Sequence, residues 1–113
     1  MLIKKSGAKR IDNSQQCTVW EYEYSSDNFS LATALINGRY PDEGKSSNEK
    51  CEQIYYAISG NGVIHSDKGN FEISAGDLYY FEIGEIYYVE GDNLLIALIN
   101  SPKWTSDQYK HVD

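Results

Sequence analysis

Residues 51–100 decide the fold prediction, and they read CEQIYYAISGNGVIHSDKGNFEISAGDLYYFEIGEIYYVEGDNLLIALIN. Runs of aromatic and β-branched residues, which favour strands, are separated by short clusters of Gly, Asn, Asp and Ser, which favour turns. The pattern predicts strands over 51–59, 63–66, 71–74, 78–82, 86–90 and 94–100. Short strands at this spacing are typical of a β-sandwich or a β-barrel.

Two more strands are expected before this region. CTVWEYEY (17–24) alternates aromatic and other residues with the period of a strand that has one buried face, and FSLATALIN (29–37) is a second apolar run. The stretch GRYPDEGKSSNEK (38–50) predicts a long loop, a kind of segment that is often functional. The tail SPKWTSDQYKHVD (101–113) is expected to hold at most one short helical turn. We therefore expect one all-β domain over residues 1–113.

Composition and charge exclude several classes of partner. The chain has 113 residues, ten Tyr and a formal net charge of −7, which argues against nucleic acid and against an anionic membrane surface. No apolar run is long enough for a transmembrane helix, and the N-terminal residues do not resemble a secretory signal. Cys17 and Cys51 are expected as thiols in a reducing cytoplasm, although a bridge between them stays open.

Two segments resemble motifs of the cupin superfamily. In QIYYAISGNG (53–62), Gln53 stands where the family has an acidic ligand, and Gly60 keeps the spacing to the turn. In the second motif Gly76-Asp77 opens the segment, residues 82–84 replace Pro-x-Gly, and Tyr87 stands where the family has a histidine. The motif-like regions span about 38–62 and 76–91, and the tail is similar to those of small bacterial cupins. The resemblance implies a cupin-type antiparallel β-barrel or jelly roll.

The resemblance also implies where a metal would bind, and this chain departs from that pattern. The family's His-x-His pair falls on Ser46 and Asn48, or in a second register on Ser47 and Glu49. The other ligand positions hold Gln53 and Tyr87, while His65 and His111 lie outside all of these positions. Amide, hydroxyl and neutral phenol groups bind first-row metals poorly, so we expect no metal or other cofactor and a neutral polar pocket.

The pocket residues follow from this reading and from strand geometry. Successive strand residues face opposite sides of the sheet. If Gln53 points inward, Tyr55 and Ala57 lie on the same face. If Tyr87 points inward, Glu85 and Val89 share its face. No catalytic residue is assigned. Four carboxylates are expected as charges at the pocket rim: Glu49, Glu52, Glu82 and Glu85. The expected ligand-binding residues are Ser46, Asn48, Gln53, Tyr55 and Tyr87.

Three functional hypotheses remain. The first is a small-molecule binding protein for a sugar or a small acid. The second is a small isomerase, epimerase or lyase for a sugar or uronate-like substrate, in which Tyr87 or a neighbouring Glu moves the proton, with or without a weakly held divalent ion. The third is a structural or regulatory subunit. A homodimer is expected from the family's habit and from the Tyr-rich outer faces. If the chain is an enzyme, we expect a general acid and a general base within reach of each other inside the barrel. If it is a binding protein, we expect an aromatic pocket without such a pair. If it is a structural protein, we expect its own side chains to fill the pocket.

Overall fold

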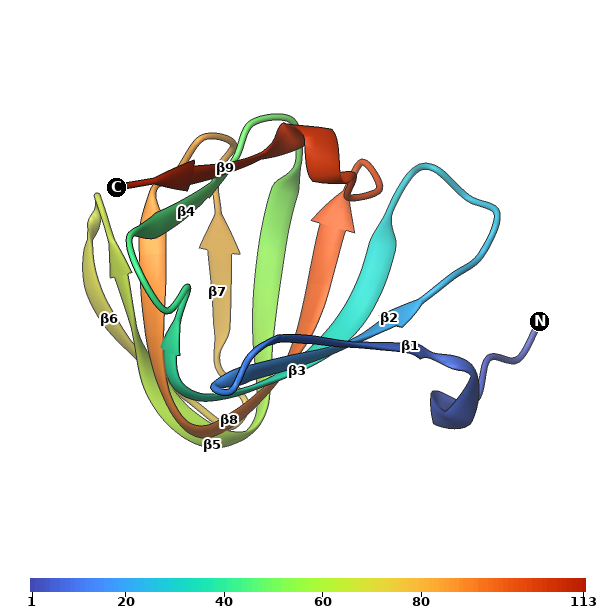
Figure 1. Cartoon of the computed structure of the whole chain (residues 1–113), viewed down its shortest axis with the longest axis horizontal. Helices are drawn as coiled ribbons and strands as arrows, with labels where there is room; N and C mark the ends of the chain where they lie inside the picture. Colours follow the sequence, from blue (N-terminus) through green and yellow to red (C-terminus); the bar gives the residue numbers. More distant parts are fainter.

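The computed structural model describes all 113 residues and shows a curled antiparallel sheet of nine strands (Figure 1). The all-β prediction is confirmed. The strands are β1 (Lys9–Ser14), β2 (Cys17–Tyr22), β3 (Ser30–Tyr40), β4 (Lys45–Asn48), β5 (Glu52–Ser66), β6 (Gly69–Ser74), β7 (Leu78–Phe81), β8 (Tyr87–Ser101) and β9 (Tyr109–Val112). Two 3-10 helices, η1 (Lys5–Gly7) and η2 (Ser106–Gln108), complete the chain, and η2 confirms the helical turn expected in the tail. No helix is long and apolar enough to cross a membrane.

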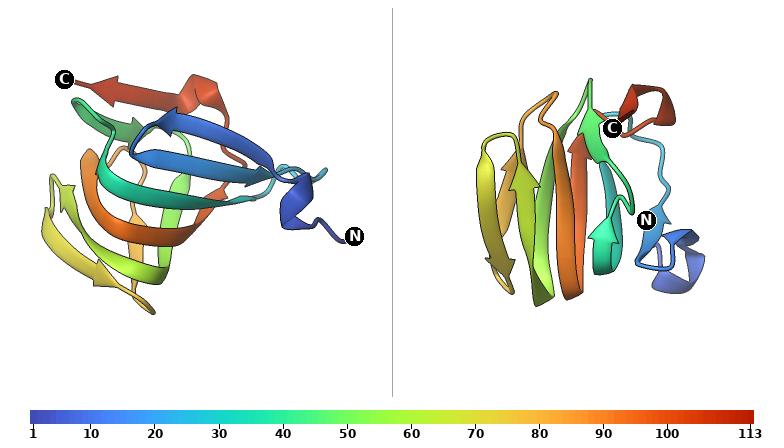
Figure 2. Two further views of the ribbon diagram at one scale, coloured as in Figure 1. Left: turned by 60° about the horizontal axis from the view of Figure 1, so that its bottom comes forward. Right: turned by 60° about the vertical axis from the view of Figure 1, so that its left-hand side comes forward.

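Three long strands form the centre of the sheet. β5 and β8 pair along their whole length, from Glu52 opposite Ser101 to Ser66 opposite Tyr87. β3 pairs with the other edge of β8. The β1–β2 hairpin continues the sheet from β3, while β6 and β7 pair with β5. Figure 2 shows these strands curling side by side, with β4 and β9 paired across one end.

The long strands curl because glycines lie at their bends. The sequence predicted turns at 60–62 and 91–93, and this was wrong, since β5 and β8 run through both segments. Gly62 pairs with Gly91, and a Cβ on Gly62 would lie 2.5 Å from the carbonyl oxygen of Glu90. A Cβ on Gly91 would lie 2.4 Å from the carbonyl oxygen of Ile36. Glycine therefore lets three backbones approach closely, and the bulges beside Ser59 add to the bend.

The segment expected as a loop also differs. β3 continues to Tyr40, and β4 occupies Lys45–Asn48, so only a short connection separates them. β4 is short and polar, and it is a strand because it pairs with β9 and touches β8 at Tyr87. β1 was not expected, since its sequence KRIDNS has no apolar alternation and its only partner is β2.

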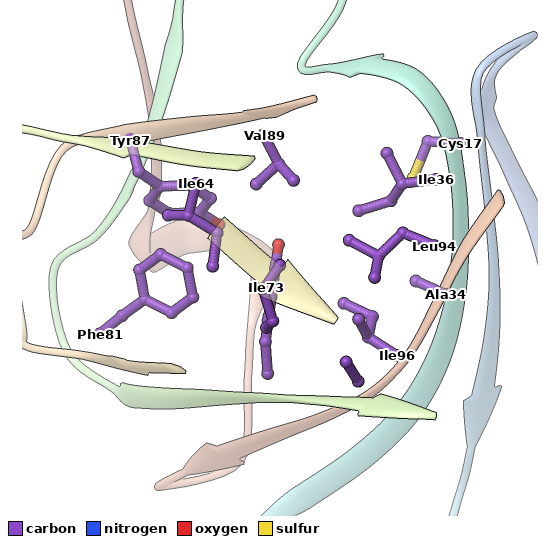
Figure 3. Packing of buried hydrophobic residues seen from close by; sticks show 12 residues of the cluster. Cys17, Ala34, Ile36, Ile64, Ile73, Phe81, Tyr87, Val89, Leu94 and Ile96 are labelled. Atoms are coloured by element: carbon purple, nitrogen blue, oxygen red, sulfur yellow. The ribbon is translucent and has the colours of Figure 1, made fainter. Parts of the chain in front are cut away.

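The apolar core lies inside the curl. Ala57, Ile64, Val89, Leu94 and Ile96 have no measurable exposure. Figure 3 labels Ile64, Val89, Leu94 and Ile96 among these inward side chains, close to Phe81 and Tyr87. The rings of Phe81 and Tyr87 have centroids 4.3 Å apart, with their planes tilted by 43°. The cluster comprises Cys17, Ala34, Ile36, Tyr55, Ala57, Ile64, Ile73, Phe81, Tyr87, Val89, Leu94 and Ile96.

The outer face of the same sheet is apolar as well. Tyr56, Ile58, Leu78 and Tyr80 are 44%, 46%, 57% and 45% exposed. Strand pairing brings them beside half-buried apolar residues of β5 and β8, because Tyr56 pairs with both Leu78 and Ala97. We call this surface the outer apolar patch, and it consists of Ile54, Tyr56, Ile58, Leu78, Tyr80, Leu95, Ala97 and Ile99.

Candidate functional site

A cavity of about 1240 Å³ lies inside the curl, beside the apolar core. Its wall comes from β1, β2, β3, β4, β5 and β8 and from the tail after β8. Five polar or phenolic residues of this wall are at most 5% exposed, and we call them the inner wall: Asn48, Gln53, Tyr55, Tyr87 and Asn100. The charged lining residues are half-buried or exposed, and we call them the mouth: Lys9, Glu21, Glu23, Asp42, Lys103 and His111.

A chain of hydrogen bonds links the inner wall to the tail. The indole N–H of Trp104 donates to Asn48 Oδ1 at 3.1 Å, and Gln108 Nε2 donates to the same oxygen at 3.2 Å. Asn48 Nδ2 donates to Gln53 Oε1 at 2.7 Å, and the Tyr87 hydroxyl donates to that oxygen at 3.3 Å. The contacts hold these side chains in one arrangement, because the oxygens of Asn48 and Gln53 each accept two specific donors.

The tail is itself anchored by a buried glutamine. Gln108 is 2% exposed, and its Oε1 accepts the backbone N–H of Lys50 at 3.2 Å and the thiol of Cys51 at 3.4 Å. The Cys51 sulfur also lies 3.7 Å from Asn100 Oδ1. Cys51 and Cys17 are free thiols in the structure. The residues that follow β8 therefore close one side of the cavity.

Aromatic packing positions the two inner phenols. The ring of Phe81 lies 4.8 Å from that of Tyr55 and 4.3 Å from that of Tyr87. Tyr55 and Tyr87 meet nearly edge to face, with centroids 6.3 Å apart and planes at 86°. Rings in such contacts have few alternative rotamers, so both side chains are held against the cavity.

Burial keeps the inner phenols and the Cys17 thiol of the cavity neutral. Desolvation raises the pKa of Tyr55 and of Tyr87 well above the usual value, and the neighbouring phenols add to the shift. The pKa of Tyr40 is raised for the same reasons, with burial the largest. Burial also raises the pKa of Cys17 to about 11. At neutral pH these groups therefore keep their protons.

The structure brings four of the five expected site residues together. Asn48, Gln53, Tyr55 and Tyr87 line one cavity, whereas Ser46 is buried behind the lining and shares a 2.6 Å hydrogen bond with the Tyr109 hydroxyl. In the alternative register, Ser47 does not line the cavity either, and Glu49 is exposed and pairs with Lys110. The role of these residues in binding stays a prediction.

The expected sharing of faces is confirmed, with one correction. Gln53, Tyr55 and Ala57 are all buried, as are Glu85, Tyr87 and Val89. Glu85 was expected as a rim charge, and this was wrong, since it is 4% exposed. Its carboxylate accepts the Ser66 hydroxyl at 2.6 Å and the backbone N–H of Glu82 at 2.9 Å, so it braces the turn before β8. It does not line the cavity. Glu49, Glu52 and Glu82 are exposed, but none of them lines the cavity, so they are not rim charges either.

Sequence reasoning missed most of the lining residues, among them Tyr40, Asn100, Trp104 and Tyr109. Tyr40 lay in the expected loop, and Trp104 and Tyr109 lie in a tail without periodicity. Asn100 could have been found, because it continues the inward positions of Leu94, Ile96 and Leu98 and is the first polar residue among them.

The side chains at the positions of the family's metal ligands do not fit a metal. Asn48, Gln53 and Tyr87 bond to one another, and their amide oxygens already accept hydrogen bonds from the protein. These groups are also weak ligands for first-row metals. No group of three or more His, Cys, Asp and Glu side chains is placed to hold a metal ion elsewhere in the chain.

Comparison with solved structures identifies the fold of the chain. No family model matches the chain, and no curated protein matches it. Among solved structures, a Streptomyces Pac13 variant with uridine has a TM-score of 0.90 and 15% identity, over 99% of this chain and 89% of that chain. Ectoine synthase from P. lautus has a TM-score of 0.77 and 19% identity, over 100% and 91%. The cupin domain of Schizosaccharomyces pombe Cnp3 has a TM-score of 0.69 and 8% identity, over 79% and 66%. The chain has the cupin fold.

This likeness confirms the expectation that rested on the two cupin motifs. The solved structures include an enzyme, since Pac13 is a nucleoside dehydratase. At these identities the likeness concerns the fold, and the chemistry of this cupin-fold chain must come from its own cavity.

Proposed function

We propose that this cupin-fold chain binds a small uncharged organic molecule that carries hydroxyl or carbonyl groups, of the sugar or nucleoside class. The observation that carries the proposal is the inner wall, where amides and neutral phenols surround about 1240 Å³ of space that the chain's own side chains leave unfilled. Mostly apolar and aromatic pockets with a few fixed polar groups are typical of small-molecule sites. The fold shared with a uridine-bound protein supports the nucleoside class.

The absence of charge from the inner wall favours a neutral ligand. Its five residues are amides and phenols, and burial raises the pKa of both phenols. A buried ligand carboxylate would find no cation there, and an unpaired buried charge costs several kcal/mol or more. The small-acid class is therefore less well supported than sugars and nucleosides.

Tyrosines on the inner and outer faces of the sheet provide a test of this proposal. Tyr55→Phe and Tyr87→Phe each remove an inner hydroxyl, whereas Tyr56→Phe changes a residue on the outer face. With uridine and a panel of monosaccharides as probes, we expect both inner variants to weaken binding about fivefold to tenfold, the usual effect of one lost hydrogen bond. Tyr56→Phe should bind as the wild type does, and calorimetric titration measures all four proteins. Failure of every probe to bind, or equal losses in all three variants, would refute the proposal.

A lyase is the second candidate, and one observation favours it. The fold matches that of a nucleoside dehydratase along nearly the whole chain. The inner wall offers no carboxylate or imidazole, so a base would have to come from Glu21, Glu23, Asp42 or His111 at the mouth. Mass spectrometry of the titrated probes would reveal turnover as loss of water.

We also propose that two copies associate through the outer apolar patch. Its exposed and half-buried residues lie on three adjacent strands, and a soluble sheet normally covers an apolar face of this kind. A second copy offers a surface of the same chemistry, as two-fold dimers require. A reducing compartment such as the cytoplasm is proposed as well, and the two free buried thiols support it.

A further inference from the structure

Two obligate donors fix the orientation of the amides in the cavity wall. An indole N–H can only donate, so the Asn48 atom that lies 3.1 Å from Trp104 Nε1 must be Oδ1. The backbone N–H of Lys50 can also only donate, so Gln108 turns Oε1 toward it and Nε2 toward Asn48. Both routes place the oxygen of Asn48 toward the tail and its Nδ2 toward Gln53.

This orientation is passed on to Gln53. Asn48 Nδ2 donates at 2.7 Å, so the Gln53 atom that it meets is Oε1, which also accepts the Tyr87 hydroxyl. Gln53 Nε2 is then left without a hydrogen bond inside the chain, on a residue that is 4% exposed and lines the cavity. Every fully enclosed side-chain nitrogen and oxygen of the chain has a hydrogen-bond partner. Because Gln53 Nε2 has none, this nitrogen is not fully enclosed and is accessible from the cavity.

Asn100 also has an amide nitrogen without a partner in the chain. Its Oδ1 lies 3.7 Å from the Cys51 thiol, and no hydrogen bond of the chain uses its Nδ2. The Tyr55 phenol keeps its proton because burial raises its pKa, so it too can donate. The amide oxygens of Asn48 and Gln53 each accept two donors from the protein already. The inner wall thus offers the cavity several donors and few free acceptors.

We propose that the inner wall recognises a carbonyl oxygen of the ligand, held by Gln53 Nε2, Asn100 Nδ2 and the Tyr55 hydroxyl. The inference rests on the proposed function and names the group that enters deepest. A carbonyl oxygen accepts hydrogen bonds without bringing a hydrogen that needs an acceptor, whereas a hydroxyl buried here would leave its own hydrogen poorly partnered. A carboxylate would also accept, but it would be buried without a cation.

The orientation can be tested without a ligand. In nitrogen-15 spectra of the wild type, the side-chain amide protons of Gln53 should exchange with water at least about tenfold faster than those of Asn48, because Asn48 Nδ2 donates to Gln53 whereas Gln53 Nε2 has no partner within the chain. Slower exchange at Gln53 than at Asn48 would overturn the inference.

The ligand preference is tested with two probes of one ring, tetrahydropyran-4-one and tetrahydropyran-4-ol. We expect the ketone to bind the wild type about tenfold more tightly, as judged by shifts of the inner-wall amides. Gln53→Met, which removes the donor at similar volume, should abolish this preference. The same change at the exposed Gln15, outside the cavity lining, should preserve it.

The outcomes separate the two proposals. Equal or tighter binding of the alcohol in the cavity, or a ketone preference that survives in Gln53→Met, overturns the inference and leaves the proposed function standing. If neither these probes nor uridine and the monosaccharides shift any cavity resonance, the proposed function fails and the inference fails with it. The wild-type comparison decides between the probes even if the Gln53→Met variant does not fold.

Discussion

The two faces of β5 carry opposite roles within one alternating sequence. On the inner face Gln53, Tyr55 and Ala57 are at most 4% exposed, and the first two belong to the cavity wall. On the outer face Tyr56 and Ile58 are 44% and 46% exposed and belong to the outer apolar patch. A strand with one face in water normally alternates apolar and polar residues, yet the segment from Ile54 to Ile58 is apolar or aromatic on both faces. The proposed ligand on the inner face and the proposed second copy on the outer face would account for this difference.

The largest expected effect contrasts two adjacent leucines of β8. Leu94 has no measurable exposure and lies in the core cluster, while Leu95 is half-buried on the outer face. Leu94→Ala should lower the free energy of unfolding by about 3–5 kcal/mol, because it removes contacts and leaves a cavity. Leu95→Ala should cost about 1 kcal/mol or less, and urea unfolding of both variants at one protein concentration measures the difference. Equal costs would break the comparison, since the outer face would then be as tightly packed as the inner one.

A second prediction concerns the outer face alone. Ile58→Lys places a charge in the outer apolar patch, where a dimer would bury it without a partner, so the association free energy should weaken by about 2–3 kcal/mol. Sedimentation velocity over a range of concentrations measures this shift. Lys68→Ala, a change at an exposed residue outside the patch, is the control and should leave association unchanged. A wild type that is monomeric at all concentrations would refute the dimer.

The smallest expected effect is a pH dependence of the folding stability, caused by a buried thiol of the inner face. The Cys17 thiol ordinarily titrates near 9.0, and burial raises its pKa in the folded chain to about 11. Between these values the unfolded chain releases a proton that the folded chain keeps, so stability is lost as pH rises through this window. By about pH 10 the loss should amount to about 1 kcal/mol relative to about pH 8.

Urea unfolding of Cys17→Ala at the same two pH values isolates this contribution. The variant should lose less stability over the interval than the wild type, whatever its stability at about pH 8. An identical loss in the two proteins would show that Cys17 has no part in the pH dependence.

Local pattern was enough to predict the strand class and much of the inner face. The alternation around Gln53 and Tyr87 gave the correct faces, because a half-buried strand repeats every two residues. The motif spacing gave the cupin fold. The segments 60–62 and 91–93 were wrongly predicted as turns. Their glycines instead allow neighbouring strands to approach closely, and the sequence of one strand does not reveal which strands lie beside it.

The rest of the cavity depended on contacts between distant segments. β4 and β9 are short and polar, and each is a strand because the other pairs with it. The same pairing brings Trp104 and Gln108 to Asn48, and neither residue carries a periodic signal. Glu85 was misjudged because its burial depends on donors from Ser66 and Tyr79, on other strands.

The amide chain also has a consequence for the order of folding. Asn48 lies 56 residues from Trp104 and 60 from Gln108 along the sequence, so both hydrogen bonds close long loops. Loop closure costs conformational entropy before the contact repays it, and folds dominated by such non-local contacts reach the native state slowly. A partly folded chain with only the local β5–β6 hairpin in place would lack the fixed polarity of the cavity. We therefore expect the amide arrangement of the cavity wall to form among the last steps of folding.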